Sequence, residues 1–268
     1  IIAFAVAAIK KLIIVAPLKR LLGFNMQTVA MFYKKASPII ANESMWGLGT
    51  FIITLLYSNL GSEHYAAVTI LKTFENIAFV IFVGICNASC VLVGKAIGAG
   101  NIKEGVVCAK RMALLVPLIS IPIGMIIIVF RNQLVQLFNL EGNITAETVR
   151  MATGIITVYA CEICIRNIPY IQIVGIFRPG GETIRGLIYD AACLWMISIP
   201  MTYVAAYVWK LDIILVYIIM YVCEDIPKAA LCLYYFFTEK WIKPVTESGK
   251  AGLENYLAEK AVSKGSRS

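Results

Sequence analysis

The acidic residue Glu43 lies in an apolar stretch that is long enough to cross a membrane. Trp46 and Thr50 follow it at helical spacing, so an acid, an aromatic ring and a hydroxyl group share one stripe of a helix. An ionisable group in a membrane is costly unless it is paired, hydrated or bound to a cation. We therefore predict that Glu43 binds a coupling cation, either a proton or a sodium ion, and that Asn42, Trp46 and Thr50 line a cavity. A neutral Glu43 that is hydrogen-bonded to a neighbouring helix is the alternative.

A second group of polar residues lies farther along the chain, in the segment CEICIRNIPY. Glu162 and Arg166 are four residues apart, in the order that favours an intrahelical ion pair. Pro169 lacks an amide hydrogen and frees a backbone carbonyl, which can open a spanning helix towards a cavity. We predict that Glu162, Arg166 and Asn167 line this cavity, and that Asn167 is a second candidate for binding the coupling cation. A purely structural ion pair is the alternative.

Three further places in the apolar segments carry ionisable residues. Asp190 has no basic residue one helical turn away, so it is a third candidate for proton or cation coupling, unless it is simply hydrated at a helix end. Lys72 and Glu75 are three residues apart, and Glu224 and Lys228 are four residues apart. This spacing predicts an intrahelical ion pair at each of these two places.

The composition indicates that all of these residues belong to an integral membrane protein. Of the 268 residues, 60% are hydrophobic and only 15% are charged, which is outside the range of soluble domains. Apolar blocks of about 20 residues or more predict spanning α-helices. We predict an all-α bundle of six transmembrane helices over residues 37–237, with spans near residues 37–59, 65–93, 112–130, 148–177, 185–208 and 212–237.

The segments on either side of this bundle are more polar. Residues 1–36 are expected to hold the end of a preceding transmembrane helix and a basic linker. Residues 238–268 are expected to form a polar cytoplasmic tail with a short interfacial helix.

Basic residues predict how the bundle is oriented. They gather in the linker, in the second and fourth loops and in the tail, whereas the alternate loops contain few of them. The positive-inside rule therefore places both ends of the 37–237 lobe in the cytoplasm. It also accounts for the net charge of +8, so nucleic acid is not an expected partner. The expected surroundings are a lipid bilayer, and we predict the plasma membrane of a bacterial cell.

Nothing in the sequence indicates an enzyme, a cofactor or a metal centre. Six of the eight cysteines lie within apolar blocks, where a free thiol is a common small apolar residue. The only histidine, His64, lies in an outer loop without an assembled nucleophile or metal ligands beside it. We therefore expect no catalytic residue and no cofactor, and no metal other than a sodium ion at Glu43.

Several segments, taken in order, resemble the second half of the multidrug and toxic compound extrusion (MATE) transporters, and most of all the DinF-like bacterial branch. They cover about residues 37–243, and the matching pieces are SPIIANESMWGLGT, SCVLVGKAIGAGNIKEG, GIFRPGGET, IYDAACLWMISIPMTYV and CEDIPKAALCLYYFFTEKWIK. The resemblance implies a transporter of twelve helices in two lobes of six, with cargo leaving through the cleft between the lobes. This chain would be the carboxyl-terminal lobe, and its partner would be the missing amino-terminal lobe, on the same chain or on a separate one.

The resemblance also assigns individual residues. Glu43 matches the acidic position of the family's seventh helix, and Asp190 and Trp195 match positions that are usual in the DinF-like branch. Asn167 stands where NorM-like members have a carboxylate, which argues against a sodium site of the NorM type. Glu182 matches an acid that follows the double glycine, and the resemblance implies a structural role for it.

Together these observations predict the carboxyl-terminal half of a secondary active antiporter. It would exchange small organic compounds, often cationic, against sodium ions or protons by alternating access. Two alternatives stay open. A lipid-linked oligosaccharide flippase shares the two-lobe plan, but its pyrophosphate substrate would need cationic groups, and only Lys72 and Arg166 could serve. A half-length membrane protein that does not transport would form a stable six-helix domain by itself.

Overall fold

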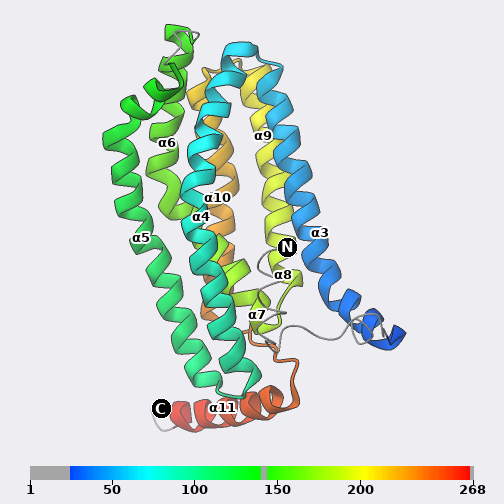
Figure 1. Ribbon diagram of the computed structural model, residues 1–268. Helices are drawn as coiled ribbons and strands as arrows, with labels where there is room; N and C mark the ends of the chain where they lie inside the picture. Colours follow the sequence, from blue (N-terminus) through cyan, green and yellow to red (C-terminus); the bar gives the residue numbers. More distant parts are fainter. Residues whose placement is uncertain (1–24, 140–143, 266–268) are drawn as a thin grey trace, which may run out of the picture.

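The chain forms an all-helical bundle in the computed structural model, which describes residues 25–139 and 144–265 (Figure 1). This confirms the predicted all-α membrane fold. Among the described residues, five continuous helical segments are long and apolar enough to cross a membrane: Ala36–Ser58, Ser62–Gly98, Ile102–Gln136, Ala146–Gly180 and Ile184–Val208. A sixth helix of 25 residues, α10, has three charged residues in its central part, which keep it out of this set. The helix end predicted before residue 25 lies outside the described residues.

The helices follow one another with short connections. In chain order they are α3 (Met26–Ser58), α4 (Ser62–Gly98), α5 (Ile102–Gln136), η1 (Leu137–Asn139), α6 (Ala146–Tyr170), η2 (Ile171–Phe177), α7 (Arg178–Gly180), α8 (Ile184–Ala191), η3 (Ala192–Ser198), α9 (Ile199–Tyr203), η4 (Val204–Val208), α10 (Ile213–Phe237) and α11 (Glu247–Gly265). The elements α6, η2 and α7 form one continuous segment, and α8, η3, α9 and η4 form another.

Successive spanning segments run in opposite directions, so the bundle has two ends (Figure 1). The turns at residues 99–101 and 181–183 lie at one end, and helix α11 crosses that end beneath α4 and α5. Two hydroxyl groups attach the tail there, because the side chains of Thr246 and Ser248 donate to the carbonyl of Gly98 at 2.7 Å and 2.8 Å. The tail is therefore held against the bundle.

Two of the spanning segments widen from α-helix into π-helix near a proline. The π-helix η2 begins two residues after Pro169, and η3 ends two residues before Pro200. A proline lacks the amide hydrogen that the α-helix uses, so a carbonyl one turn earlier loses its partner and the hydrogen-bond register can shift. Trp195, in η3, donates from its indole nitrogen to the carbonyl of Met45 in α3 at 3.1 Å. The widened turn is thereby fixed against its neighbour.

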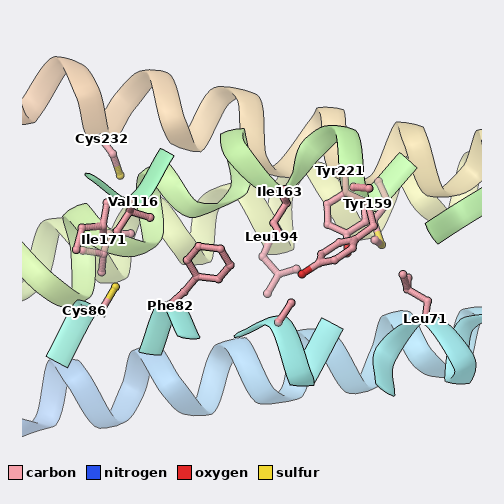
Figure 2. Packing of buried hydrophobic residues seen from close by; sticks show 14 of the residues in the cluster. Leu71, Phe82, Cys86, Val116, Tyr159, Ile163, Ile171, Leu194, Tyr221 and Cys232 are labelled. Carbon is pink, nitrogen blue, oxygen red and sulfur yellow. The ribbon is translucent and has the colours of Figure 1, made fainter. Parts of the chain in front are cut away.

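The core of the bundle is packed from the inner faces of several helices (Figure 2). Phe82 of α4, Ile163 of α6 and Leu194 of η3 are at most 2% exposed. Because lipid is as apolar as these side chains, close van der Waals packing holds the helices together more than the exclusion of water does. In contrast, Val80 and Met196 are more than two-thirds exposed, as expected of side chains that face lipid.

The turn after α7 is held by the buried carboxylate of Glu182. Gly181 before it has a φ of +94°, and a Cβ there would lie 1.9 Å from the carbonyl oxygen of Lys243, so only glycine fits. Glu182 accepts from the Tyr235 hydroxyl at 2.8 Å and from the Arg185 amide at 3.2 Å, and it pairs with the Lys243 ammonium. These contacts join the turn to the end of α10 and to the tail.

The electrostatics of Glu182 agree with the structural role that the resemblance implies. Burial by itself would raise the pKa of its carboxyl group. The hydrogen bonds from Lys243, Tyr235 and the Arg185 amide outweigh burial and lower the pKa below its ordinary value. The residue is therefore most stable as a charged, fully bonded carboxylate.

Candidate functional site

Two neighbouring cavities lie among the spanning helices, with volumes of about 180 Å³ and about 200 Å³. Trp46, Arg166 and Glu224 line both of them, so the cavities adjoin. The other residues that line the first cavity are Asn42, Glu43, Phe79, Asn167, Pro169, Tyr170, Ile173, Val174, Arg178, Asp190, Asp225 and Lys228. Those that complete the second are Thr50, Ile53, Tyr57, Val68, Leu71, Lys72, Glu75, Asn76, Tyr217, Met220 and Tyr221.

One ammonium group, that of Lys228 in α10, contacts three carboxylates at the wall of the first cavity. Its Nζ lies 3.1 Å from Asp190 Oδ1, 3.0 Å from Glu224 Oε1 and 3.4 Å from Asp225 Oδ1. Two of these acids belong to α10 itself, and Asp190 belongs to α8, so the lysine joins two helices. We call these four residues the Lys228 cluster. Three acids share one base here, so the cluster carries an excess of negative charge when all four groups are ionised.

Two buried oxygen atoms, one in the Lys228 cluster and one on a residue that contacts it, have no hydrogen-bond partner. Asn42 of α3 donates from Nδ2 to Asp190 Oδ2 at 3.1 Å, but its own Oδ1 is unpartnered. Oδ2 of Asp225 is also buried and unpartnered. Asn42 and Asp225 are 6% and 2% exposed, and both line the first cavity. Because a buried acceptor without a donor or a cation is costly, these oxygens are candidate ligands for a positively charged group.

Glu43 also lines the first cavity, but it is not part of the Lys228 cluster. Its side chain is 57% exposed, and its Oε1 accepts from Arg178 Nη2 at 2.6 Å. Asn42, the preceding residue, lies on another face of the helix and contacts Asp190. The residue beside the buried acids is thus the amide and not the acid. The role of Glu43 in cation binding stays a prediction.

Arg166 of α6 lies between the two cavities. Its guanidinium pairs with Glu75 of α4 and donates to the Tyr221 hydroxyl. It also lies over the rings of Tyr221 and Tyr159, at 4.9 Å and 5.8 Å from their centroids. The Tyr217 hydroxyl donates to that of Tyr221 at 2.7 Å, which extends the network along α10. This arginine is therefore held by one full charge pair and two aromatic faces.

Two intrahelical ion pairs predicted from the sequence are wrong. Within the described residues, no ion pair links Lys72 to Glu75 or Glu162 to Arg166, because Glu75 and Arg166 pair with each other between α4 and α6. The physical reason is the planar guanidinium, which stacks on aromatic rings and binds carboxylates in a defined direction. The rings of α6 and α10 direct it towards α4. Spacing along one helix does not contain this information.

The remaining candidates have different surroundings. Asn167 lines the first cavity, but its Nδ2 donates to Ser120 Oγ at 3.2 Å and to the Ile163 carbonyl at 2.8 Å. Glu162 lines neither cavity, and its carboxyl group lies beside that of Asp225. Thr50 lines the second cavity. The structure therefore brings most of the predicted residues to the lining of these two cavities. Glu162 is the exception, since it lines neither cavity.

The spacing of Glu224 and Lys228 predicts a simple pair and does not reveal their link to Asp190. The pair itself is confirmed, at 3.0 Å. A usable signal was present, because α10 carries two acids and one base in its apolar part, while Asp190 has no base within one turn of its own helix. An unpaired acid on one helix and a base with several acids on another predict a contact between the two.

Comparisons with known proteins agree with one another. The family model described as MatE matches residues 38–204. A probable multidrug resistance protein NorM from Thermotoga maritima is 27% identical over 207 residues, which are 77% of this chain and 43% of that protein.

Solved structures of low sequence identity share the fold. The eukaryotic MATE transporter AtDTX14 matches 86% of this chain and 50% of its own, with a TM-score of 0.72 and 18% identity. A MOP superfamily transporter from Pyrococcus furiosus matches 79% and 46%, with a TM-score of 0.65 and 16% identity. The chain thus spans about half the length of the proteins that it matches.

Proposed function

The chain belongs to the MATE family of multidrug transporters, and from this premise we propose that it is one lobe of an antiporter that exports organic cations. In the proposal it is the carboxyl-terminal lobe, and a second six-helix lobe completes the transporter. Sodium ions or protons move in the opposite direction to the cargo. Such two-lobe designs alternate the access of a central site between the two sides of the membrane.

The observation that carries this proposal is the excess of negative charge at the Lys228 cluster. Buried charges are stabilised mainly by partners of opposite sign, and here three carboxylates share one ammonium group. Within the part of the chain that the structure describes, the other ion pairs between cavity-lining residues are balanced, Glu43 with Arg178 and Glu75 with Arg166. A positively charged cargo or coupling ion would therefore be attracted to the Lys228 side of the first cavity.

Aromatic residues of the first cavity support an organic cargo. Trp46, Phe79 and Tyr170 line it, and the rings of Phe79 and Tyr170 lie 4.8 Å apart between their centroids. Aromatic faces attract cations that have lost part of their water shell, and they also supply flat apolar contact area. A cavity lined by both acids and aromatic rings suits a flat organic cation.

Coupling to an ion needs an acid that can change between a bound and a free state. Among the candidates, Asp190 is the best supported, because it contacts both Lys228 and Asn42 from a third helix and lines the first cavity. Glu43 is more exposed and already has a partner in Arg178. Asn167 offers an amide and no charge. We therefore place coupling first at Asp190 and second at Glu43.

Efflux of ethidium from cells that produce the full-length protein tests the proposal. We expect the wild-type protein to export ethidium when a sodium or proton gradient is present, and Asp190→Asn to abolish this export. Glu43→Gln should give a smaller loss. Glu247→Gln is a matched control, because Glu247 lies in α11 with a side chain that is 90% exposed. Wild-type cells that export no organic cation under either gradient, or an Asp190→Asn variant with full export, would reject the proposal.

The flippase alternative has weaker support. A pyrophosphate substrate needs cationic groups that can leave their partners, and Arg166 is held by Glu75 and two tyrosine rings. Of the two cationic residues that could bind a pyrophosphate, only Lys72 is then left, and it lines the second cavity. A full-length protein that binds a lipid-linked pyrophosphate more tightly than ethidium would favour this alternative.

A further inference from the structure

Lys228 stands where a bound cation would be expected. Its ammonium group lies within 3.0–3.4 Å of oxygens from three carboxylates, in a wall of the first cavity. We propose that this ammonium is a built-in counter-cation, which a monovalent cation replaces among Asp190, Glu224 and Asp225. The replacing group is either a sodium ion or the positively charged group of an organic cation. This inference rests on the proposed function and adds the residue that sets the affinity for the cation.

The oxygen atoms around the ammonium suit such a replacement. Besides the three oxygens that contact Lys228, the buried Oδ2 of Asp225 and Oδ1 of Asn42 have no hydrogen-bond partner. A lysine ammonium has only three hydrogens to donate, so it cannot satisfy all of these acceptors. A cation without fixed donor directions can approach all of them, because carboxylate and amide oxygens are the ligands that hard cations prefer. The site draws its oxygens from α3, α8 and α10.

Competition between the lysine and the cation follows from their charges. Two positive groups within a few ångströms of each other in a medium of low dielectric constant repel strongly. The lysine stem is flexible over four carbon atoms, so its ammonium can move within the cavity while the backbone of α10 stays in place. Binding of the cation therefore displaces the ammonium from the carboxylates.

The lysine would also assist release of the cation. Three buried acids without any base would hold a cation very tightly, because the empty site would be strongly unfavourable. When the cation leaves, the ammonium returns and replaces its charge. The affinity is thereby lowered to a range in which cargo or ion can dissociate during each cycle.

Binding measurements on the full-length protein in detergent test the role of Lys228. We would titrate sodium and ethidium separately into the wild-type protein and into the Lys228→Gln and Lys228→Met variants, by isothermal titration calorimetry. We expect both variants to bind at least one of these cations about tenfold more tightly, equivalent to about 1.4 kcal/mol. Lys228→Arg keeps the charge and should not bind more tightly. Lys250→Gln is the matched control, since Lys250 in α11 is 56% exposed and pairs with Glu247.

Each outcome decides the proposal. Folded Lys228→Gln and Lys228→Met variants that bind both cations no more tightly than the wild type would overturn it. If neither variant folds, thermal unfolding in membranes with and without each cation gives the answer: rescue of folding by a cation supports the replacement, and no rescue overturns it. Tighter binding of sodium alone identifies an ion site, and tighter binding of ethidium alone a cargo site. A wild-type protein that binds neither cation would reject the proposed function itself, whereas wild-type binding that the variants do not change rejects only the role of Lys228.

Discussion

Glu182 and Asp225 are both almost fully buried, at 3% and 2% exposed, but their carboxylates have opposite surroundings. Glu182 receives donors from Tyr235, Lys243 and the Arg185 amide. Asp225 shares one ammonium with two other acids, and its Oδ2 has no donor. A complete set of partners stabilises the fold at one end of the bundle. An incomplete set in the middle of the bundle leaves binding capacity for a cation.

The largest effect on stability is expected where a complete buried pair is broken. Arg166→Met would leave the Glu75 carboxylate between the cavities without its base, which we expect to lower the free energy of unfolding by about 3–5 kcal/mol. The midpoint of thermal unfolding in detergent measures this change. The double variant Arg166→Met/Glu75→Gln should recover most of the loss. Equal midpoints for Arg166→Met and the wild type would show that the pair adds no stability.

Removal of the charge at Glu182 should have the next largest effect on the stability of the fold. We expect Glu182→Gln to lower the free energy of unfolding by about 1.5–3 kcal/mol, because hydrogen bonds to a charged group are lost. Ethidium binding should be unchanged, since Glu182 lines neither cavity. Thermal unfolding and an ethidium titration measure the two quantities. If the folded Glu182→Gln variant bound ethidium more weakly than the wild type, Glu182 would not have a purely structural role.

Acid should weaken the same turn. The pKa of Glu182 in the folded protein is lowered from its ordinary value of 4.5, so its contribution to stability is present above that value and is lost as the pH falls through the lowered pKa. The stability that the protein loses by protonation of Glu182 cannot exceed the stability that Glu182→Gln removes. We expect the unfolding midpoint of the wild type to fall more steeply below about pH 4.5 than that of Glu182→Gln. Parallel curves for the two proteins would show that Glu182 is not responsible.

The smallest effect on stability is expected at Asp225. Its Oδ2 has no donor to lose, and Lys228 keeps Asp190 and Glu224 as partners, so Asp225→Asn should change the free energy of unfolding by less than about 0.5 kcal/mol or increase it. The affinity for ethidium or sodium should nevertheless fall by about tenfold or more, because one charged ligand is lost. Unfolding and titration of the same sample measure both. If Asp225→Asn lost much stability but kept its affinity for both cations, Asp225 would have a structural role like that of Glu182 and no role in cation binding.

The sequence by itself determines the membrane class, the helical fold and the approximate spans. These follow from local properties, since the thickness of the hydrocarbon layer demands apolar blocks and each helix satisfies its own backbone. Helical periodicity likewise predicts that Trp46 and Thr50 share a stripe, and it predicts the pair of Glu224 with Lys228, which the structure confirms.

Contacts between helices are decided only by the tertiary structure. Arg166 pairs with Glu75 and not with Glu162, and Lys228 reaches Asp190 on another helix. These contacts depend on how each helix is rotated about its axis, and the π-helical turns near Pro169 and Pro200 shift that rotation partway along a span. Periodicity along a single helix contains no information on its rotation relative to its neighbours, so the identity of the buried cluster emerges only when the helices are packed together.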